Sequence, residues 1–101
     1  MVIPRDWIDD VKIEHRGEDG GMNITLFVEP PKGVKYAPTY RELTMLAISV
    51  FRDAVDPDAK RFEATHADVM AWSDEGHSGL MAPYRYRVTM DFEPKDGHDN
   101  A

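Results

Sequence analysis

The feature that most constrains the fold is a strict alternation of apolar and polar residues near the C-terminus. The apolar set is Tyr84, Tyr86, Val88, Met90 and Phe92, and the polar set is Arg85, Arg87, Thr89, Asp91 and Glu93. Successive side chains of a β-strand point to opposite faces of a sheet, so this pattern predicts a strand with one apolar face. Such a face must be covered by a second layer, and the strand needs neighbours on both sides.

An earlier region with the same period predicts a β-hairpin. Val11, Ile13 and His15 alternate with charged residues, and apolar residues return at every second position from 22 to 28. Three glycines in the connecting segment 17–21 allow positive φ angles in the turn. Pro30 ends the second strand, because proline has no N–H to donate to a neighbouring strand.

One long helix is predicted between these two regions. The segment 39–42 matches a capping box, in which Thr39 and Glu42 each satisfy the other's backbone N–H. Apolar residues then recur every three or four positions, which is typical of a helix that lies on a sheet. Pro57 disfavours helical geometry at Asp56, so the helix should end near Val55.

The segment 56–72 leaves two structures open. Asp56 followed by Pro57 would suit the start of a second helix, and four alanines raise the helix propensity of the segment. Two short runs, 62–65 and 69–72, instead lead into the polar segment 73–79, as strands do before a wide hairpin. We favour a strand over about residues 65–72.

These elements predict a single α+β domain over residues 1–94. Its core is an antiparallel sheet of about four strands with one long helix on one face, in the order β-β-α-β-β, with β-β-α-α-β as the alternative. A chain of 101 residues buries roughly two-thirds of its surface on folding, which is enough for one domain. Residues 95–101 are polar and are predicted to form a flexible tail.

Charge and cysteine content exclude several classes of function. The net charge of -7 repels phosphate backbones and anionic lipid, so we expect neither nucleic acid nor a membrane as a direct partner. The absence of cysteine excludes disulfides, thiolate metal sites and cysteine nucleophiles. No apolar run is long enough to span a membrane and the first residues do not resemble a secretory leader, so we expect a cytoplasmic protein.

The sequence gives little support for catalysis. His66 and Asp68 share a strand face, and His77 or Asp74 would be a third metal ligand, but no short-spaced histidine pair is present. A hydrolytic triad with Ser78 lacks the strained turn that nucleophilic serines occupy. We therefore predict no catalytic, metal-binding or cofactor-binding residues, and a small enzyme that uses His66 or His77 is the least favoured alternative.

Surface charge and exposed aromatic residues point to protein binding. Acidic residues at the C-terminal end of a helix oppose its dipole, which suggests a use other than helix stability for the aspartates near Val55. Large aromatic residues and arginines dominate the binding energy of protein interfaces. The predicted partner-binding residues are Asp53, Asp56, Asp58, Asp74, Glu75, Trp72, Phe27, Arg85 and Arg87.

The favoured function is a non-enzymatic protein-binding module, acting as a monomer or homodimer. By analogy of class, we expect a small acidic inhibitor of the phage or mobile-element type, which docks on a basic surface of a host nucleic-acid enzyme. The alternative is a structural subunit of a homo-oligomeric, virion-like or tail-like assembly. In that case the last strand or the hairpin would pair edge to edge.

Overall fold

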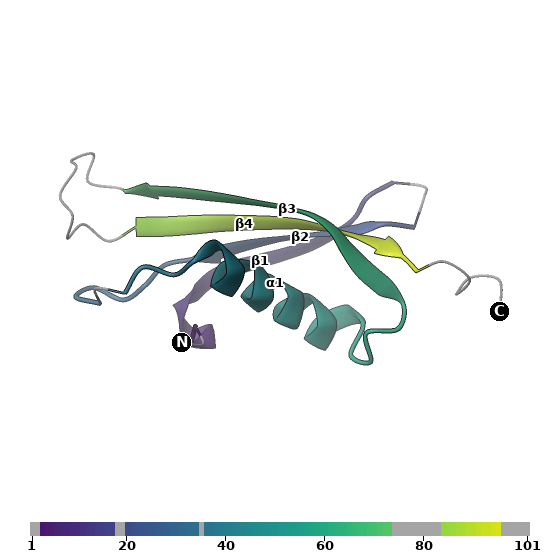
Figure 1. The fold of residues 1–101 in the computed structure, drawn as a ribbon, viewed down its shortest axis with the longest axis horizontal. Helices are drawn as coiled ribbons and strands as arrows, with labels where there is room; N and C mark the ends of the chain where they lie inside the picture. The colour runs from purple at the N-terminus through teal and green to yellow at the C-terminus, as the bar shows by residue number, and fades with distance from the viewer. Residues whose placement is uncertain (1–2, 18–19, 35, 74–83, 96–101) are drawn as a thin grey trace.

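A computed structural model describes residues 3–17, 20–34, 36–73 and 84–95. Within these ranges, one antiparallel sheet of four strands packs on one α-helix, as predicted (Figure 1). A short 3-10 helix, η1, comes first. The elements in chain order are η1 (Arg5–Trp7), β1 (Ile8–His15), β2 (Met22–Val28), α1 (Tyr40–Val55), β3 (Phe62–Ser73) and β4 (Tyr84–Pro94).

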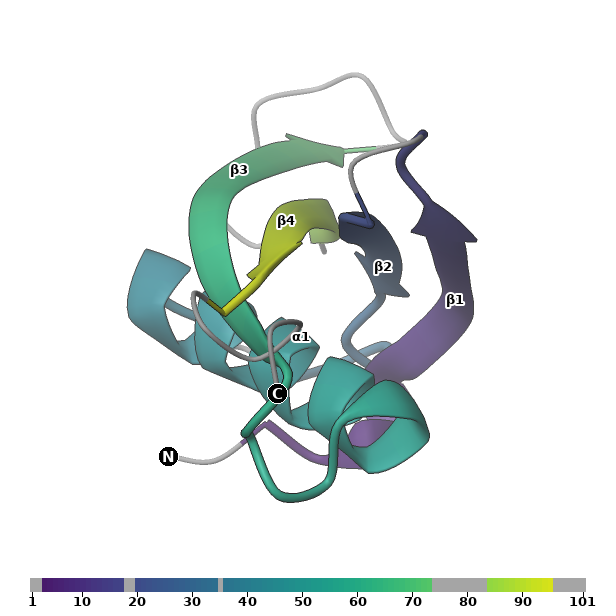
Figure 2. The ribbon, with the colours of Figure 1, turned by 90° about the vertical axis from the view of Figure 1, so that its right-hand side faces the viewer.

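The strands lie in the order β1-β2-β4-β3, and each pairs antiparallel with its neighbour. The last strand therefore has a neighbour on both sides, as its alternation predicted, and β1 and β3 form the two edges. Leu26 lies opposite Val88 and Ile24 opposite Met90, which brings the apolar faces of β2 and β4 together. Figure 2 shows the sheet curving around α1, so that one face is concave and covered.

The segment after α1 forms a strand, and the alternative of a second helix is wrong. β3 begins at Phe62, three residues before the predicted start, and pairs with β4 along its whole length. Alanine favours a helix by less than about 1 kcal/mol per residue, a local preference that tertiary contacts override. Pairing with β4 buries Phe62 and packs Ala67 and Val69 against the core, and these tertiary contacts favour the strand.

Lys95 does not belong to a flexible tail. Its backbone N–H donates to the Arg61 carbonyl at 3.0 Å, and its Nζ donates to the Ala59 carbonyl at 2.6 Å. These bonds fix the end of β4 to the loop before β3. The remainder of the predicted tail, residues 96–101, lies outside the described residues.

The capping box predicted for α1 is present. Thr39 Oγ1 accepts from the Glu42 N–H at 3.1 Å, and the Glu42 carboxylate accepts from the Thr39 N–H at 2.9 Å. The helix ends at Val55, as the position of Pro57 predicted, and the Asp56 N–H donates to the Arg52 carbonyl. Its buried face consists of Leu43, Thr44, Leu46, Ala47, Val50 and Phe51.

Three buried phenylalanines join α1 to the sheet. The Phe51 ring of α1 stacks on Phe92 of β4, with the ring centroids 3.7 Å apart and the planes 5° from parallel. Phe62 of β3 meets the Phe51 ring edge-on at 5.7 Å. Aromatic pairs contribute about 0.5–1.5 kcal/mol beyond the area they bury. Phe51 is therefore the contact that places the helix against two strands at once.

Glu42 is also held by a second donor. The Tyr36 hydroxyl donates to its carboxylate, and this bond, followed by the one from the Thr39 N–H, lowers the pKa of Glu42 to about 2. A carboxyl whose pKa is lowered by folding contributes stability above its unfolded pKa and loses that contribution in acid. The contribution of this helix cap to stability is therefore lost as the pH falls below the ordinary pKa of a glutamate.

We predict that Phe51→Ala lowers the free energy of unfolding by about 3–5 kcal/mol, the usual cost of removing a buried phenylalanine ring. Urea unfolding followed by circular dichroism measures this. Tyr40→Ala, on the exposed side of the same helix, is the control and should change stability by about 0.5 kcal/mol or less. A loss below about 1 kcal/mol for Phe51→Ala would contradict the central role of this ring.

We also predict that Glu42→Gln removes part of the acid sensitivity of the fold. The original chain should be the more stable above pH 5, and its advantage should shrink as the pH falls from 4.5 towards 2. Unfolding midpoints of both proteins, measured at several pH values, give the difference. A constant difference over this range would show that the Glu42 carboxylate is not stabilised by folding.

Candidate functional site

The three aspartates of the predicted acidic cluster have different environments, and Asp56 is a structural residue. Its side chain is only 2% exposed. Its Oδ1 accepts from the N–H groups of Lys60 at 3.2 Å and Arg61 at 3.1 Å, and its Oδ2 accepts from Arg61 at 3.1 Å and Phe62 at 3.0 Å. The carboxylate ties the loop after α1 to the start of β3. Its prediction as a partner-binding residue is therefore corrected.

The Asp56 carboxylate stays ionised in this position. Burial disfavours its charged form, but the N–H groups of Phe62, Arg61 and Lys60 and the charge of Arg61 outweigh that cost. The pKa of Asp56 consequently lies below its ordinary value. An aspartate directly after a helix opposes the dipole of that helix, and here the backbone N–H groups of the following loop compensate for it.

Asp53 and Asp58 do not share the burial of Asp56. Arg5 donates to Asp53 Oδ2 and to Ser49 Oγ, both at 2.7 Å, and so links η1 to α1. Asp58 is exposed in the loop before β3. One aspartate is buried and another is already paired, so the three do not form a single free acidic patch. Asp74 and Glu75 lie outside the described residues.

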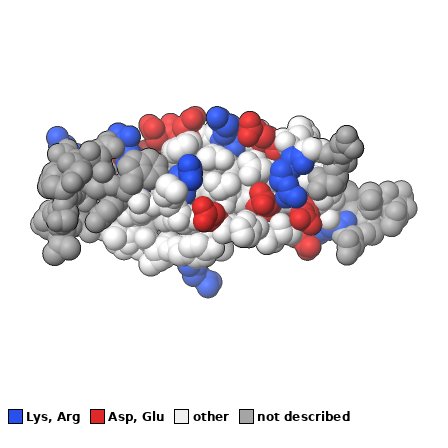
Figure 3. Space-filling model, turned by 90° about the horizontal axis from the view of Figure 1, so that it is seen from above, with Lys and Arg blue, Asp and Glu red and all other residues white. Residues whose placement is uncertain are grey.

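The face of the sheet turned away from α1 brings other predicted residues together. We call it the open face. Phe27 of β2 lies opposite Arg87 of β4 on one side and opposite Asp10 of β1 on the other, and Met70 of β3 lies opposite Arg87. These four residues, the central row, cross all four strands. Figure 3 views this side and shows charges of both signs separated by uncharged surface.

The central row has the composition of a protein interface. Met70 is 47% exposed, while Phe27 and Arg87 are partly exposed. Arg87 donates to the Met70 sulfur at 3.7 Å, and among the described residues no carboxylate lies within ion-pair distance of its guanidinium. Aromatic residues, methionine and arginine are enriched at interface cores. The sequence missed Met70, because the secondary structure of its segment was ambiguous.

Some charged residues of the open face form ion pairs within the chain. Arg85, a predicted partner-binding residue, lies 3.6 Å from the Glu29 carboxylate. At the other end of the open face, Arg16 lies 3.9 Å from Asp91 and 3.8 Å from Glu93. These exposed pairs contribute at most about 1 kcal/mol each, so they hold the surface in shape only weakly.

The two tryptophans lie in different parts of the fold. Trp7 is 6% exposed and packs in the core, and its carbonyl accepts from the Glu29 N–H at 2.8 Å. It therefore fills the core and is not an anchor for a partner. Trp72 pairs with Arg85 in the register of β3 and β4, and its side chain lies outside what the structure describes.

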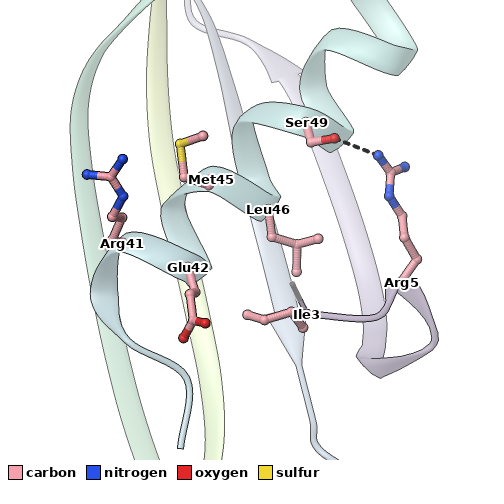
Figure 4. A pocket seen from close by; sticks show the side chains of 7 residues that line it. All are labelled: Ile3, Arg5, Arg41, Glu42, Met45, Leu46 and Ser49. Atoms are coloured by element: carbon pink, nitrogen blue, oxygen red, sulfur yellow. Dashed lines mark hydrogen bonds between the residues drawn. The ribbon is translucent and has the colours of Figure 1, made fainter. Parts of the chain in front are cut away.

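A groove of about 500 Å³ lies between the N-terminal segment and α1, on the side away from the sheet (Figure 4). Ile3 and Leu46 face each other in it, and the Arg5–Ser49 hydrogen bond closes one end. The one carboxylate in its lining, Glu42, already accepts from Tyr36 and Thr39. The groove thus offers apolar surface without a free acid or base for catalysis.

The described residues show no metal site. His66 is exposed and lies opposite Asp91, while His77 and Ser78 fall outside the described part of the chain. Residues 3–17, 20–34, 36–73 and 84–95 contain no group of three His, Cys, Asp or Glu side chains placed to bind a metal ion. Within the same ranges, no helix has the length and apolar character needed to cross a membrane.

Comparison of the chain with protein-family models, with curated proteins and with solved structures found no match. We therefore infer the function from the geometry of the chain itself. That geometry brings Phe27 and Arg87 together on the open face and gives Asp53, Asp56 and Asp58 different environments.

We predict that Asp56→Asn lowers the free energy of unfolding by about 1–3 kcal/mol, because an amide has one acceptor oxygen for N–H groups that now bind two. Asp58→Asn removes the same charge from an exposed neighbour and should change stability by about 0.5 kcal/mol or less. Urea unfolding at neutral pH compares the two variants. Equal effects would contradict the structural role of Asp56.

Proposed function

We propose that this chain is a non-enzymatic protein-binding domain that contacts its partner through the open face of the sheet. The observation that carries the proposal is the central row of Met70, Arg87, Phe27 and Asp10, which crosses all four strands on the side that α1 leaves uncovered. The solvated face of an antiparallel sheet is usually polar. An aromatic and a sulfur-containing side chain beside an arginine favour recognition of another protein.

The residues of the central row define the chemistry of the partner surface. Phe27 and Met70 would enter an apolar recess, and the Arg87 guanidinium would bind a carboxylate at its border. Among the described residues Arg87 makes no ion pair that would first have to break. Its planar, weakly hydrated guanidinium suits such a contact better than a lysine would.

The narrower expectation of an acidic inhibitor stays a prediction. The net charge of -7 supports electrostatic steering towards a basic partner, and Asp58 is exposed. Asp53 and Asp56 do not contribute free carboxylates to that surface, so Asp74 and Glu75 would have to provide more of it. A cytoplasmic location, predicted from the sequence, belongs to this proposal as well.

The test is a quantitative binding experiment with matched charge reversals. The tagged chain, its Arg87→Glu variant and its Arg41→Glu variant are used to capture proteins from cells of the source organism, and each captured protein is measured in all three samples. Arg41 is exposed on α1, away from the open face, so its reversal controls for net charge. Circular dichroism confirms that each variant is folded.

We predict that the partner is retained in stoichiometric amounts by the original chain and by Arg41→Glu, and that Arg87→Glu loses it at least about tenfold, in line with an interface hot spot. Phe27→Ala should weaken binding of the purified partner to a similar extent. A partner that is lost with Arg41→Glu and kept with Arg87→Glu would place the binding surface on the helix side and overturn the proposal.

A further inference from the structure

The two edge strands of the sheet differ in how they are protected from pairing with another strand. Four of the eight residues of β1 are charged, and its pairing is irregular between Ile8 and Asp10. Charged side chains and bulges are the usual means of blocking an edge. β1 is therefore a poor template for a further strand.

β3 lacks these protecting features along most of its length. Only Glu63 and Asp68 are charged among its twelve residues, and it contains no lysine, arginine, proline or glycine within its bounds. Its one irregularity lies between Ala64 and His66, after which residues 66–73 pair with β4 without interruption. In the described part of the chain no strand pairs with the other side of β3. Among the described residues, its outer row of N–H and C=O groups has no strand partner, and such a row can bond to a further strand.

We propose that β3 pairs antiparallel with β3 of a second copy of this chain, with Val69 on the two-fold axis. This inference is independent of the binding partner proposed above. Pairing of identical antiparallel strands is self-complementary, so it forms a closed dimer and not a filament. In this register Ala67 lies opposite Ala71 of the second copy, and Asp68 lies opposite Met70.

Charge and the extent of regular pairing favour this arrangement. The uninterrupted stretch 66–73 is centred beside Val69, whereas an axis at Ala67 would bring the irregularity between Ala64 and His66 into the contact. An axis at Asp68 would place two carboxylates directly opposite each other, which is unfavourable. Pairing of β3 with β1 of the second copy would bring Asp68 towards a strand with three acidic residues and one lysine, namely Asp9, Asp10, Glu14 and Lys12. With the axis at Val69, no residue of 66–72 faces a like charge, and small apolar residues meet on the concave side.

The proposed dimer also extends the open face. A two-fold axis perpendicular to the sheet keeps both α1 helices on one side, so four strands from each copy form one continuous sheet. Met70 of each copy then lies beside Asp68 of the other. This removes the unprotected edge of β3 and leaves the charged β1 at both ends of the larger sheet.

The sequence suggested a different strand for edge-to-edge pairing between copies. The alternative of a homo-oligomeric subunit placed this contact on the last strand or the hairpin, but β4 is bonded to β2 and β3 on its two sides. β4 therefore has no free edge. Of the two hairpin strands, β1 and β2, only β1 has a free edge, and this is the charged edge described above.

The test uses the absence of cysteine from the chain. Val69→Cys introduces one thiol at the proposed axis, where the two Cα atoms would lie about 4.5–5.5 Å apart, within the range that a disulfide spans. Val11→Cys places the same substitution on the other edge strand as the control. Both variants are oxidised under equal conditions, and covalent dimer is measured by non-reducing electrophoresis.

Light scattering of the unaltered chain gives an independent answer. We expect a mass of about twice 11.5 kDa, and covalent dimer from Val69→Cys on the order of tenfold faster than from Val11→Cys. Val69→Lys should halve the scattering mass, because two lysines would face each other at the axis, and Val11→Lys should leave it unchanged. Circular dichroism checks the fold of each variant.

Two results would overturn the proposal. The first is a monomeric mass for the unaltered chain at every concentration up to the millimolar range, whatever the variants do. The second is a dimer whose mass is unchanged by Val69→Lys, with equal cross-linking of Val69→Cys and Val11→Cys, which would place the interface elsewhere.

Discussion

The contact of Phe51 with Phe92 and Phe62 holds the helix, the central strand β4 and the edge strand β3 in one core. The stacked and edge-on rings come from three separate segments of the chain. A sheet curved around one helix can bury only its concave face in this way. The position of α1, the depth of the core and the identity of the uncovered face all follow from this packing.

The sixteen-residue helix α1 covers one face of the sheet. The other face of the sheet is exposed and must therefore be compatible with water. Most of its residues are polar, and their ion pairs lie along the strands. Phe27 and Met70 depart from this pattern at the middle of the face, beside Arg87. Because these two side chains add nothing to the core, we attribute their presence to contact with a partner protein. This is the basis of the proposed function.

Local patterns predicted most of the fold, because the alternation of 84–93 and the capping box of Thr39 and Glu42 act within a few residues of chain. The strand at Phe62–Ser73 was harder to predict, since its alanines favour a helix and only pairing with β4 decides otherwise. The role of Asp56 could not be read from sequence. It depends on a loop that returns three N–H groups to one carboxylate.

The most direct test of the two-faced sheet uses the four phenylalanines of the chain. Fluorine NMR of protein labelled with fluorophenylalanine, recorded with a soluble paramagnetic probe, reports which rings meet solvent. We predict that the signal of Phe27 broadens, while those of Phe51, Phe62 and Phe92 do not. Broadening of Phe51 or Phe92, or protection of Phe27 equal to theirs, would contradict the assignment of the covered and open faces.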